Sequence, residues 1–201
     1  METYKLSILT KKLYDSKLSL MNSRTLNTIL GINNEQTFFR IIAGLKKDNI
    51  IRKVERDKYQ INHQAVDDFE MANFLYEPSY VSLETALNYW GILSQFPFEI
   101  TCVTNKKSVV KKLDDKIFAY HHLSPKLYGM FYKEKNSLIA SPEKALFDQL
   151  YFASKGLGTV KSDEYDLSKV NRKNFLNLCN QLRANKGMMK FIAELKWYGS
   201  C

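Results

Sequence analysis

Ser141 and Lys144 form the pattern in this sequence that most resembles a catalytic pair. Their spacing places the lysine one helical turn after the serine, as in the Ser-x-x-Lys pair of acyl-enzymes. However, Ser-Pro-Glu is also a common helix start, with serine as the cap, Pro142 at the first helical position and Glu143 in the first turn. The Ser-Asp-Asn and Lys-Thr-Gly partners of that chemistry are missing. We therefore interpret Ser141 as a helix cap.

Three other patterns also fall short of a reactive site. His121 and His122 are adjacent in a predicted strand, so their side chains point to opposite faces and cannot chelate one metal together. Asp114 and Asp115 lack a third carboxylate at a suitable spacing for a metal site. The segment 156–158 lacks a third glycine and follows a predicted helix, unlike a dinucleotide-binding loop. We therefore expect no catalytic residue, no metal and no cofactor, and we predict that the protein is not an enzyme.

Two basic pairs, Lys106-Lys107 and Lys111-Lys112, stand on either side of a short segment that begins with Ser108. Runs of charge are usually solvated loops, and we interpret this segment in that way. The alternative is a second patch of lysines that contacts phosphate groups.

One predicted helix, ending near residue 47, presents a polar stripe opposite an apolar face. The inward-facing arc contains the apolar residues Phe38, Ile41, Ile42 and Leu45. The stripe on the opposite face, at spacings of four, three and four, contains Gln36, Arg40, Ala43 and Lys47. In the DNA major groove arginine suits guanine, while glutamine or asparagine suits adenine. We therefore predict contacts to base edges from Asn33, Gln36 and Arg40.

A winged helix-turn-helix over residues 18–61 would position these side chains in a major groove. Asn22 can cap a short helix and Gly31 can end it, after which Asn33 or Asn34 can cap the next helix. Two short strands, 50–54 and 59–61, follow around a charged turn. Contacts to phosphates position a protein on DNA without reading its sequence. We predict such contacts from Arg24, Lys46, Lys47, Arg52, Arg56 and Lys58. The alternative is a helical scaffold that packs against another protein.

The charge distribution agrees with this interpretation. The 201 residues carry a net charge of +9. Residues 1–62 hold 12 Lys and Arg against 6 Asp and Glu, a net of +6, and residues 63–201 hold 18 against 15, a net of +3. Such a concentration is typical of a nucleic-acid-binding module. The composition is that of a folded protein, since hydrophobic residues make up 45% of the chain.

Several sequence features bear on the compartment. No apolar run is long enough for a membrane helix, and the first five residues lack the apolar core of a signal peptide. The three cysteines, Cys102, Cys179 and Cys201, are far apart and odd in number, which predicts reduced thiols. We therefore expect a cytoplasmic protein that does not contact a membrane.

The chain is predicted to have α+β architecture with three parts. Residues 1–63 form the winged helix-turn-helix, residues 64–77 a structured connector, and residues 78–201 an α+β domain with a small mixed or antiparallel sheet and several helices. Its strands are predicted at 98–104, 116–123, 127–132 and 137–140, and its helices at 83–90, 142–154, 172–183 and 186–197.

The stretch Tyr-Glu-Pro-Ser-Tyr-Val-Ser-Leu-Glu-Thr-Ala-Leu-Asn-Tyr-Trp-Gly, at residues 76–91, carries a more specific signal. It resembles the signature segment of AbiEi-type antitoxins, which follows an N-terminal winged helix in that family. Residues 99–104, 118–123 and 139–148 agree with the family in the same order, so the resemblance covers about residues 5–155. From the residues alone, we expect Ser82 to cap a helix whose buried face contains Leu83, Ala86, Leu87 and Trp90. We interpret Tyr80 and Tyr89 as packed aromatics, with exposed recognition aromatics as the alternative.

The resemblance implies a component of a type IV toxin–antitoxin system that acts by abortive infection in phage defence. Its winged helix would bind inverted repeats in the promoter DNA and repress the operon. Its C-terminal domain would neutralise a cognate nucleotidyltransferase-like toxin, with or without direct contact. The resemblance supplies no catalytic residues.

Two other functions remain open from the sequence. One is a plain transcription regulator whose C-terminal domain binds an effector or a partner, with no toxin. The other is a nuclease, although the sequence lacks a readable carboxylate–lysine constellation.

Overall fold

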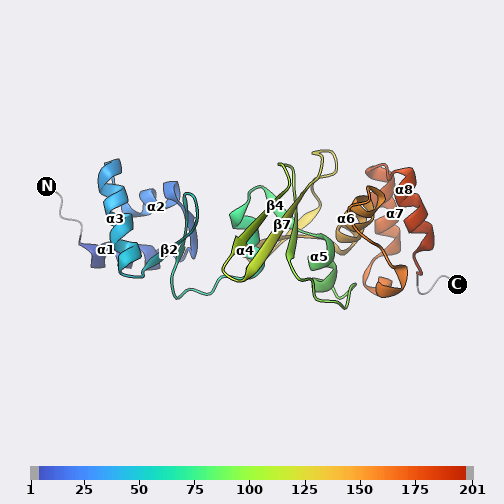
Figure 1. Ribbon diagram of the computed structural model, residues 1–201, viewed down its shortest axis with the longest axis horizontal. Helices are drawn as coiled ribbons and strands as arrows, with labels where there is room; N and C mark the ends of the chain where they lie inside the picture. The colour runs from blue at the N-terminus through green and yellow to red at the C-terminus, as the bar shows by residue number, and fades with distance from the viewer. Residues whose placement is uncertain (1–4, 198–201) are drawn as a thin grey trace. The chain divides into compact units, whose positions relative to one another are not determined.

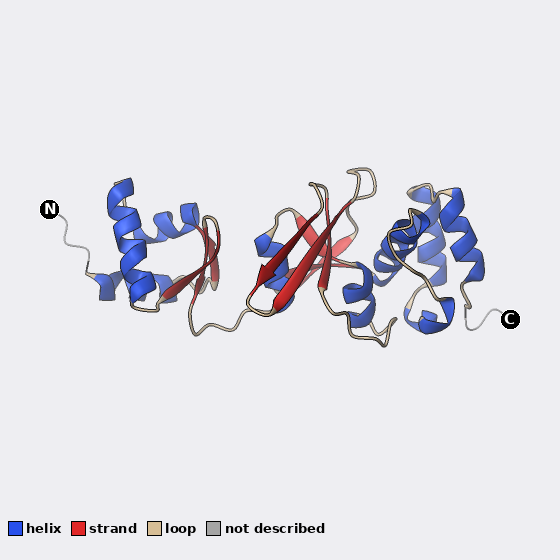
Figure 2. Ribbon diagram, in the orientation of Figure 1, coloured by secondary structure: helices blue, strands red, loops and turns tan. Residues whose placement is uncertain are grey.

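The computed structural model describes residues 5–197, and the chain divides into two compact units. The first unit extends to Asp67 and the second begins at Asp68 (Figure 1). Among the described residues there are eight α-helices, one three-stranded sheet and one six-stranded sheet (Figure 2). The predicted mixed α+β class is therefore confirmed. The expectation of a reduced thiol at Cys201 concerns a residue outside this range. The expectation about a signal peptide rests largely on the first four residues, which also lie outside it.

The first unit combines three helices with a small antiparallel sheet in the order β1-β3-β2. Its elements in chain order are α1 (Leu6–Asp15), β1 (Leu20–Asn22), α2 (Ser23–Leu30), α3 (Glu35–Lys47), β2 (Ile51–Glu55) and β3 (Lys58–Ile61). The side chain of Asn22 caps α2 by accepting a hydrogen bond from the backbone N–H of Thr25 at 2.8 Å. Gly31 ends α2 in the left-handed conformation (φ +69°) that glycine adopts readily.

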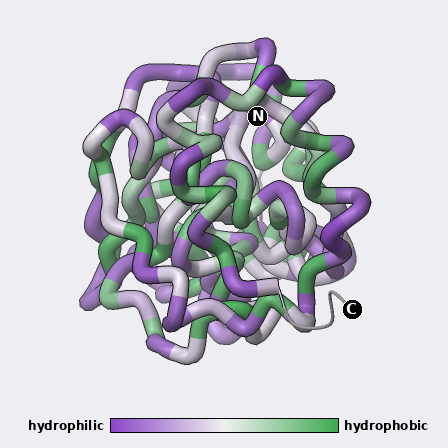
Figure 3. Tube along the Cα trace, turned by 90° about the vertical axis from the view of Figure 1, so that its right-hand side faces the viewer, coloured by the Kyte–Doolittle hydropathy of each residue, from purple (hydrophilic) through white to green (hydrophobic). Residues whose placement is uncertain are grey.

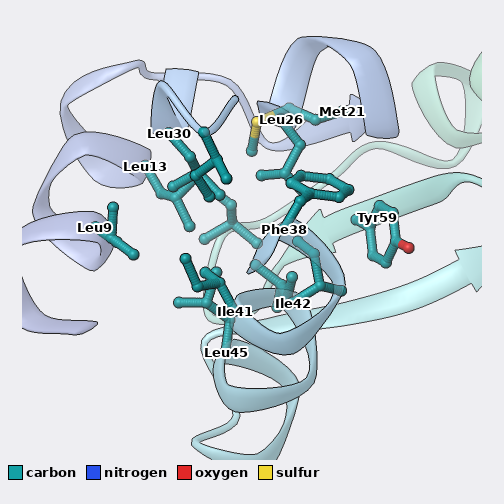
Figure 4. Packing of buried hydrophobic residues seen from close by; sticks show 13 residues of the cluster. Leu9, Leu13, Met21, Leu26, Leu30, Phe38, Ile41, Ile42, Leu45 and Tyr59 are labelled. Atoms are coloured by element: carbon teal, nitrogen blue, oxygen red, sulfur yellow. The ribbon is translucent and has the colours of Figure 1, made fainter. Parts of the chain in front are cut away.

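The core of the first unit lies between its helices and the sheet. Figure 4 shows the apolar face of α3 packed against leucines of α1 and α2. Leu13, Leu26, Leu30 and Leu45 are completely buried, and Tyr59 of β3 adds an aromatic ring. Because α3 is anchored along this face, its opposite face is held toward solvent.

The second unit is built on a mixed sheet in the order β6-β7-β5-β4-β9-β8. The pairs β4–β9 and β5–β7 are parallel, and the remaining neighbours are antiparallel. Its strands are β4 (Ser79–Val81), β5 (Ile100–Thr104), β6 (Val109–Leu113), β7 (Lys116–His122), β8 (Phe131–Glu134) and β9 (Ser137–Ala140). Its helices are α4 (Asp68–Leu75), α5 (Leu83–Tyr89), α6 (Pro142–Ser154), α7 (Arg172–Gln181) and α8 (Lys186–Glu194), with short 3-10 turns at Ser162–Glu164 and Leu167–Lys169.

This sheet is larger than the sequence predicted. β6 was missed because its lysines suggested a loop, whereas it is an edge strand whose side chains alternate between partly covered and exposed. The strand expected at 127–132 begins only at Phe131, because the chain turns at 124–128 through hydrogen bonds back to Ser124.

Hydrophilic and hydrophobic segments alternate along the Cα trace, as expected for elements that each cover the core with one face (Figure 3).

The predicted connector, 64–77, was too long. Residues 68–75 form α4, which buries Met71, Ala72 and Leu75. The hydroxyl of Tyr120 in β7 donates to the carbonyl of Ala72 at 2.6 Å, so this helix is part of the second unit. Helix α4 belongs there because its apolar side chains need the sheet to cover them.

The segment that resembles the antitoxin signature is largely buried, as expected, but two of its side chains differ from prediction. Ser82 precedes α5 without capping it through its side chain. Trp90 is only half-buried, and its indole N–H donates to the carbonyl of Ala140 at 2.8 Å. Tyr80 is fully buried, and Tyr89, although 44% exposed, has ring contacts with Phe69 and Trp90, so both tyrosines pack against other residues and only Tyr80 lies in the core.

Ser82 does not cap α5 through its hydroxyl because that group joins a buried polar cluster. Its hydroxyl donates to Asp148 at 2.8 Å, and the hydroxyl of Tyr80 donates to the same carboxylate at 3.0 Å. The ammonium of Lys144 binds Asp148 and also donates to the Tyr80 oxygen at 2.9 Å. Burial, followed by the nearby Asp148 carboxylate, raises the pKa of Tyr80 far above its usual range. The cluster thus fastens β4 to α6.

Removing one charge of this cluster should destabilise the fold strongly. We expect Lys144→Met to lower the free energy of unfolding by about 3–5 kcal/mol, because it leaves the Asp148 charge buried and unpaired. Adding Asp148→Asn should restore a large part of the loss, since the amide oxygen still accepts from both hydroxyls. Urea unfolding followed by circular dichroism measures both effects. Lys161→Met, which removes the exposed pair with Glu164, is the matched control and should change nothing measurable. An unchanged urea midpoint for Lys144→Met would contradict this account.

Candidate nucleic-acid interface

Helix α3 presents the polar stripe that the sequence predicted. Gln36, Arg40, Ala43 and Lys47 are all exposed, and the apolar arc on the other side of the helix is buried. Arg40 and Gln36 lie one helical turn apart, so their side chains project in nearly the same direction. The small side chain of Ala43 leaves room for a groove edge to approach the backbone of the helix.

The two asparagines before α3 have different roles. Asn34 caps the helix, because its side-chain oxygen accepts from the backbone N–H of Thr37 at 2.9 Å. Asn33 is exposed in the loop between α2 and α3 and makes no cap. The structure therefore resolves the open choice of cap in favour of Asn34 and leaves Asn33 available for an external contact.

The predicted phosphate-contacting residues fall into separate groups. The hydroxyl and backbone N–H of Ser23 bind Asp57 at 3.3 Å and 2.9 Å, which brings the turn between β2 and β3 against the start of α2. Arg24, Arg56 and Lys58 are therefore brought together around that turn, each adjacent in sequence to one of the two bonded residues.

The turn contains no glycine, but Asp57 takes the left-handed position with φ +57°. Aspartate tolerates this conformation better than most side chains. The exposed contact between Arg56 and Asp57, at 3.7 Å, holds the guanidinium only weakly because both side chains are well solvated.

Lys46 and Arg52 lie apart from both groups. Lys46 is exposed on α3, but it precedes Lys47 and so projects about 100° around the helix axis from it. Arg52 is half-buried on β2, and its Nε donates to the side-chain oxygen of Gln60 at 2.8 Å. These two residues could contact a DNA backbone only beside the polar stripe of α3.

Phe39 is a residue that the sequence interpretation missed. It is 50% exposed on α3 beside Arg40, and its ring makes a T-shaped contact with the ring of Phe38 at a centroid distance of 5.5 Å. Apolar side chains that enter a DNA major groove can contact the methyl group of thymine. The sequence did contain a signal for this residue, because Phe39 is an aromatic residue outside the apolar arc of the predicted helix.

The groups considered for catalysis have structural roles. The hydroxyl of Ser141 accepts from the backbone N–H of Lys144 at 3.1 Å, which confirms the helix-cap interpretation. Lys144 and Asp148 form a carboxylate–lysine pair that the sequence reading missed, but both side chains are completely buried. The signal for it was a pair of opposite charges four residues apart in an apolar helix.

The remaining groups that could react lie apart or in the core. Within residues 5–197, no three His, Cys, Asp or Glu side chains gather where they could hold a metal ion. Cys102 and Cys179 are buried free thiols, and burial raises the pKa of Cys179 to about 11. None of the helices in the described part of the chain has the length and apolar character needed to cross a membrane.

Comparisons of this chain with known protein-family models and with curated proteins found no match. The resemblance to AbiEi-type antitoxins therefore stays a prediction that rests on the quoted residues.

The two asparagines should respond differently to substitution. Asn34→Ala should lower the free energy of unfolding by about 1 kcal/mol, because the N–H of Thr37 loses its capping oxygen. Asn33→Ala should leave unfolding unchanged, since its side chain caps nothing. Thermal melts of the two variants and the parent chain provide the measurement. Equal destabilisation by both changes would show that the capping assignment is wrong.

Proposed function

We propose that this protein is a DNA-binding antitoxin that represses its own operon through a winged helix in the first unit. The observation that carries the DNA-binding part is the exposed stripe of Gln36, Arg40 and Lys47 on a helix anchored by a fully packed face. Such a helix keeps its polar side chains in a fixed arrangement, which reading base edges requires.

The order of elements supports the winged-helix proposal. A short capped helix leads through a tight turn into α3, and a basic two-stranded hairpin follows. In this proposal α3 enters the major groove, and the turn between β2 and β3 is the wing. Arg24, Arg56 and Lys58 then contact phosphates beside the groove.

The division of labour between the units follows from the resemblance. The second unit carries the signature-like segment around Tyr80 and supplies the antitoxin activity. Its target is a nucleotidyltransferase-like toxin, neutralised with or without direct contact. The partner of the first unit is promoter DNA with inverted repeats, and the site of action is the cytoplasm.

Binding to DNA should weaken steeply as salt rises. Each Lys or Arg that neutralises a phosphate releases counterions, and each contact contributes about 0.9 to the slope of log affinity against log salt. The excess charge on residues 1–62, a net of +6, motivates this expectation. The measurement is a fluorescence-anisotropy titration of a promoter duplex at several potassium chloride concentrations. An affinity that stays flat would remove the basis for phosphate contacts.

Two substitutions on α3 should separate base reading from phosphate binding. Arg40→Ala should weaken promoter binding by roughly 1–3 kcal/mol and reduce the preference for the promoter over an unrelated duplex. Lys47→Ala should weaken binding to both duplexes alike. Both residues are exposed, so both variants should fold like the parent. If Arg40→Ala still prefers the promoter over the unrelated duplex as strongly as the parent does, Arg40 does not read a base.

The same Arg40→Ala variant tests the division of labour. It should derepress a promoter–reporter yet still rescue cells from the toxin when it is expressed from an unrelated promoter. Loss of rescue with normal folding would mean that the first unit itself neutralises the toxin. If the parent chain binds the promoter but rescues no cells, the antitoxin part fails and a plain regulator remains.

A further inference from the structure

An open hollow of about 710 Å³ lies on the second unit where the chain passes from β5 to β6. Its size falls within the range of about 300–1,000 Å³ that is typical of ligand sites. Its lining residues are Tyr76, Asn105, Lys106, Lys107, Ser108 and His122. All six are polar or aromatic and none is acidic, so the hollow suits an anionic ligand.

Tyr76 gathers the lysines around this hollow. The ammonium groups of Lys106 and Lys111 lie over its ring, at 5.6 Å and 5.2 Å from the centroid. The hydroxyl of Tyr76 donates to the backbone carbonyl of Lys107 at 3.0 Å, and its ring packs edge-on against Tyr120. Cation–π attraction to one ring thus offsets part of the repulsion between the two ammonium groups.

The loop that carries Lys106 and Lys107 is fixed before any ligand binds. The Nδ1 of His122 donates to the carbonyl of Lys106 at 2.8 Å, and the backbone N–H of His122 donates to the hydroxyl of Ser108 at 2.9 Å. The backbone N–H of Lys106 donates to the hydroxyl of Thr104 at 3.1 Å. Because these bonds already order the loop, less conformational entropy is lost on binding.

Lys107 is the cation most available to a ligand. It is exposed, and its ammonium forms no ion pair within the described part of the chain. By contrast, the ammonium of Lys106 also donates to the backbone carbonyl of Glu77. The hollow therefore combines the exposed ammonium of Lys107 with the positioned ammonium of Lys106 and a half-exposed tyrosine, whose ring also contacts Lys111.

We propose that this hollow binds the phosphate groups of single-stranded nucleic acid. Proteins that hold single strands combine a positively charged groove with aromatic side chains. A recessed site with lysines around one ring admits a flexible strand, whereas a rigid duplex presents its phosphates on a convex surface. A free nucleotide carries the same phosphate chemistry. The site is independent of α3, so it does not rest on the proposed promoter binding.

The test uses the full chain with Arg40→Ala and Lys47→Ala, which weaken the proposed duplex interface. A labelled single-stranded RNA of about 12 nucleotides is titrated by fluorescence anisotropy. Adding Lys107→Glu should weaken binding about tenfold and reduce the salt slope by about 0.7. Tyr76→Leu should also weaken binding, because Lys106 and Lys111 lose their shared ring.

The matched control is Lys133→Glu. Lys133 is exposed on β8, at the opposite edge of the same sheet from β6. Because both variants replace lysine by glutamate, they change the net charge by the same amount. This variant should bind the RNA like its parent. If Lys107→Glu and Lys133→Glu bind equally well, the proposal is overturned.

Two further arms identify the ligand. In the first arm, unlabelled ATP competes with the labelled RNA. Displacement of the RNA by ATP indicates a site for a single nucleotide, whereas retention of the RNA indicates a strand held by several contacts. A promoter duplex is titrated against Lys107→Glu in the chain that retains Arg40 and Lys47. If duplex binding falls while RNA binding does not, the lysines extend the duplex interface and the single-strand proposal is wrong.

Discussion

The buried ion pair between Lys144 and Asp148 is the interaction on which the second unit depends. Both side chains are completely shielded from solvent, and transferring two charges out of water is costly unless nearly all their hydrogen-bonding capacity is used. Tyr80 and Ser82 supply the missing partners for the carboxylate. Because β4 lies between β5 and β9, fastening it to α6 also fixes the middle of the sheet.

The same cluster explains the local structure of the signature-like segment. With its hydroxyl bound to Asp148, Ser82 provides no side-chain cap for α5, and the next residue, Leu83, adopts φ +56°. A buried leucine in this conformation is strained by about 1–2 kcal/mol, which the surrounding contacts must offset. A Ser–Tyr–Lys–Asp set would suggest chemistry if it lined a cleft. Here the four side chains are completely buried, and each of their polar atoms has a defined partner. The set therefore favours one packing arrangement of β4 against α6.

Much of the first unit could be predicted because its signals are local. Asn22, Gly31 and the apolar spacing of α3 act within a few residues, and the exposed stripe follows directly from that spacing. The grouping of Arg24 with the turn at Asp57 could not be predicted, since it depends on a hydrogen bond across 34 residues. In the second unit the errors at β6, Ser82 and Trp90 have a common cause. Each of these positions is decided by a partner that local propensity does not reveal: pairing with β7 across a short turn for β6, and the distant residues Asp148 and Ala140 for Ser82 and Trp90.

Net charge also misleads when distant contacts are unknown. Residues 63–201 carry only +3, which suggests a nearly neutral surface. However, the charge of Lys144 is neutralised inside the core, and Lys116 and Lys161 are paired with Asp68 and Glu164. Such pairing removes cations from some regions while the β5–β6 loop retains its lysines around Tyr76. The electrostatic field that a ligand meets therefore depends on which charges the fold has already paired. A unit of low net charge can thus hold a local site for anions, while the first unit spreads its charge over a helix and a turn.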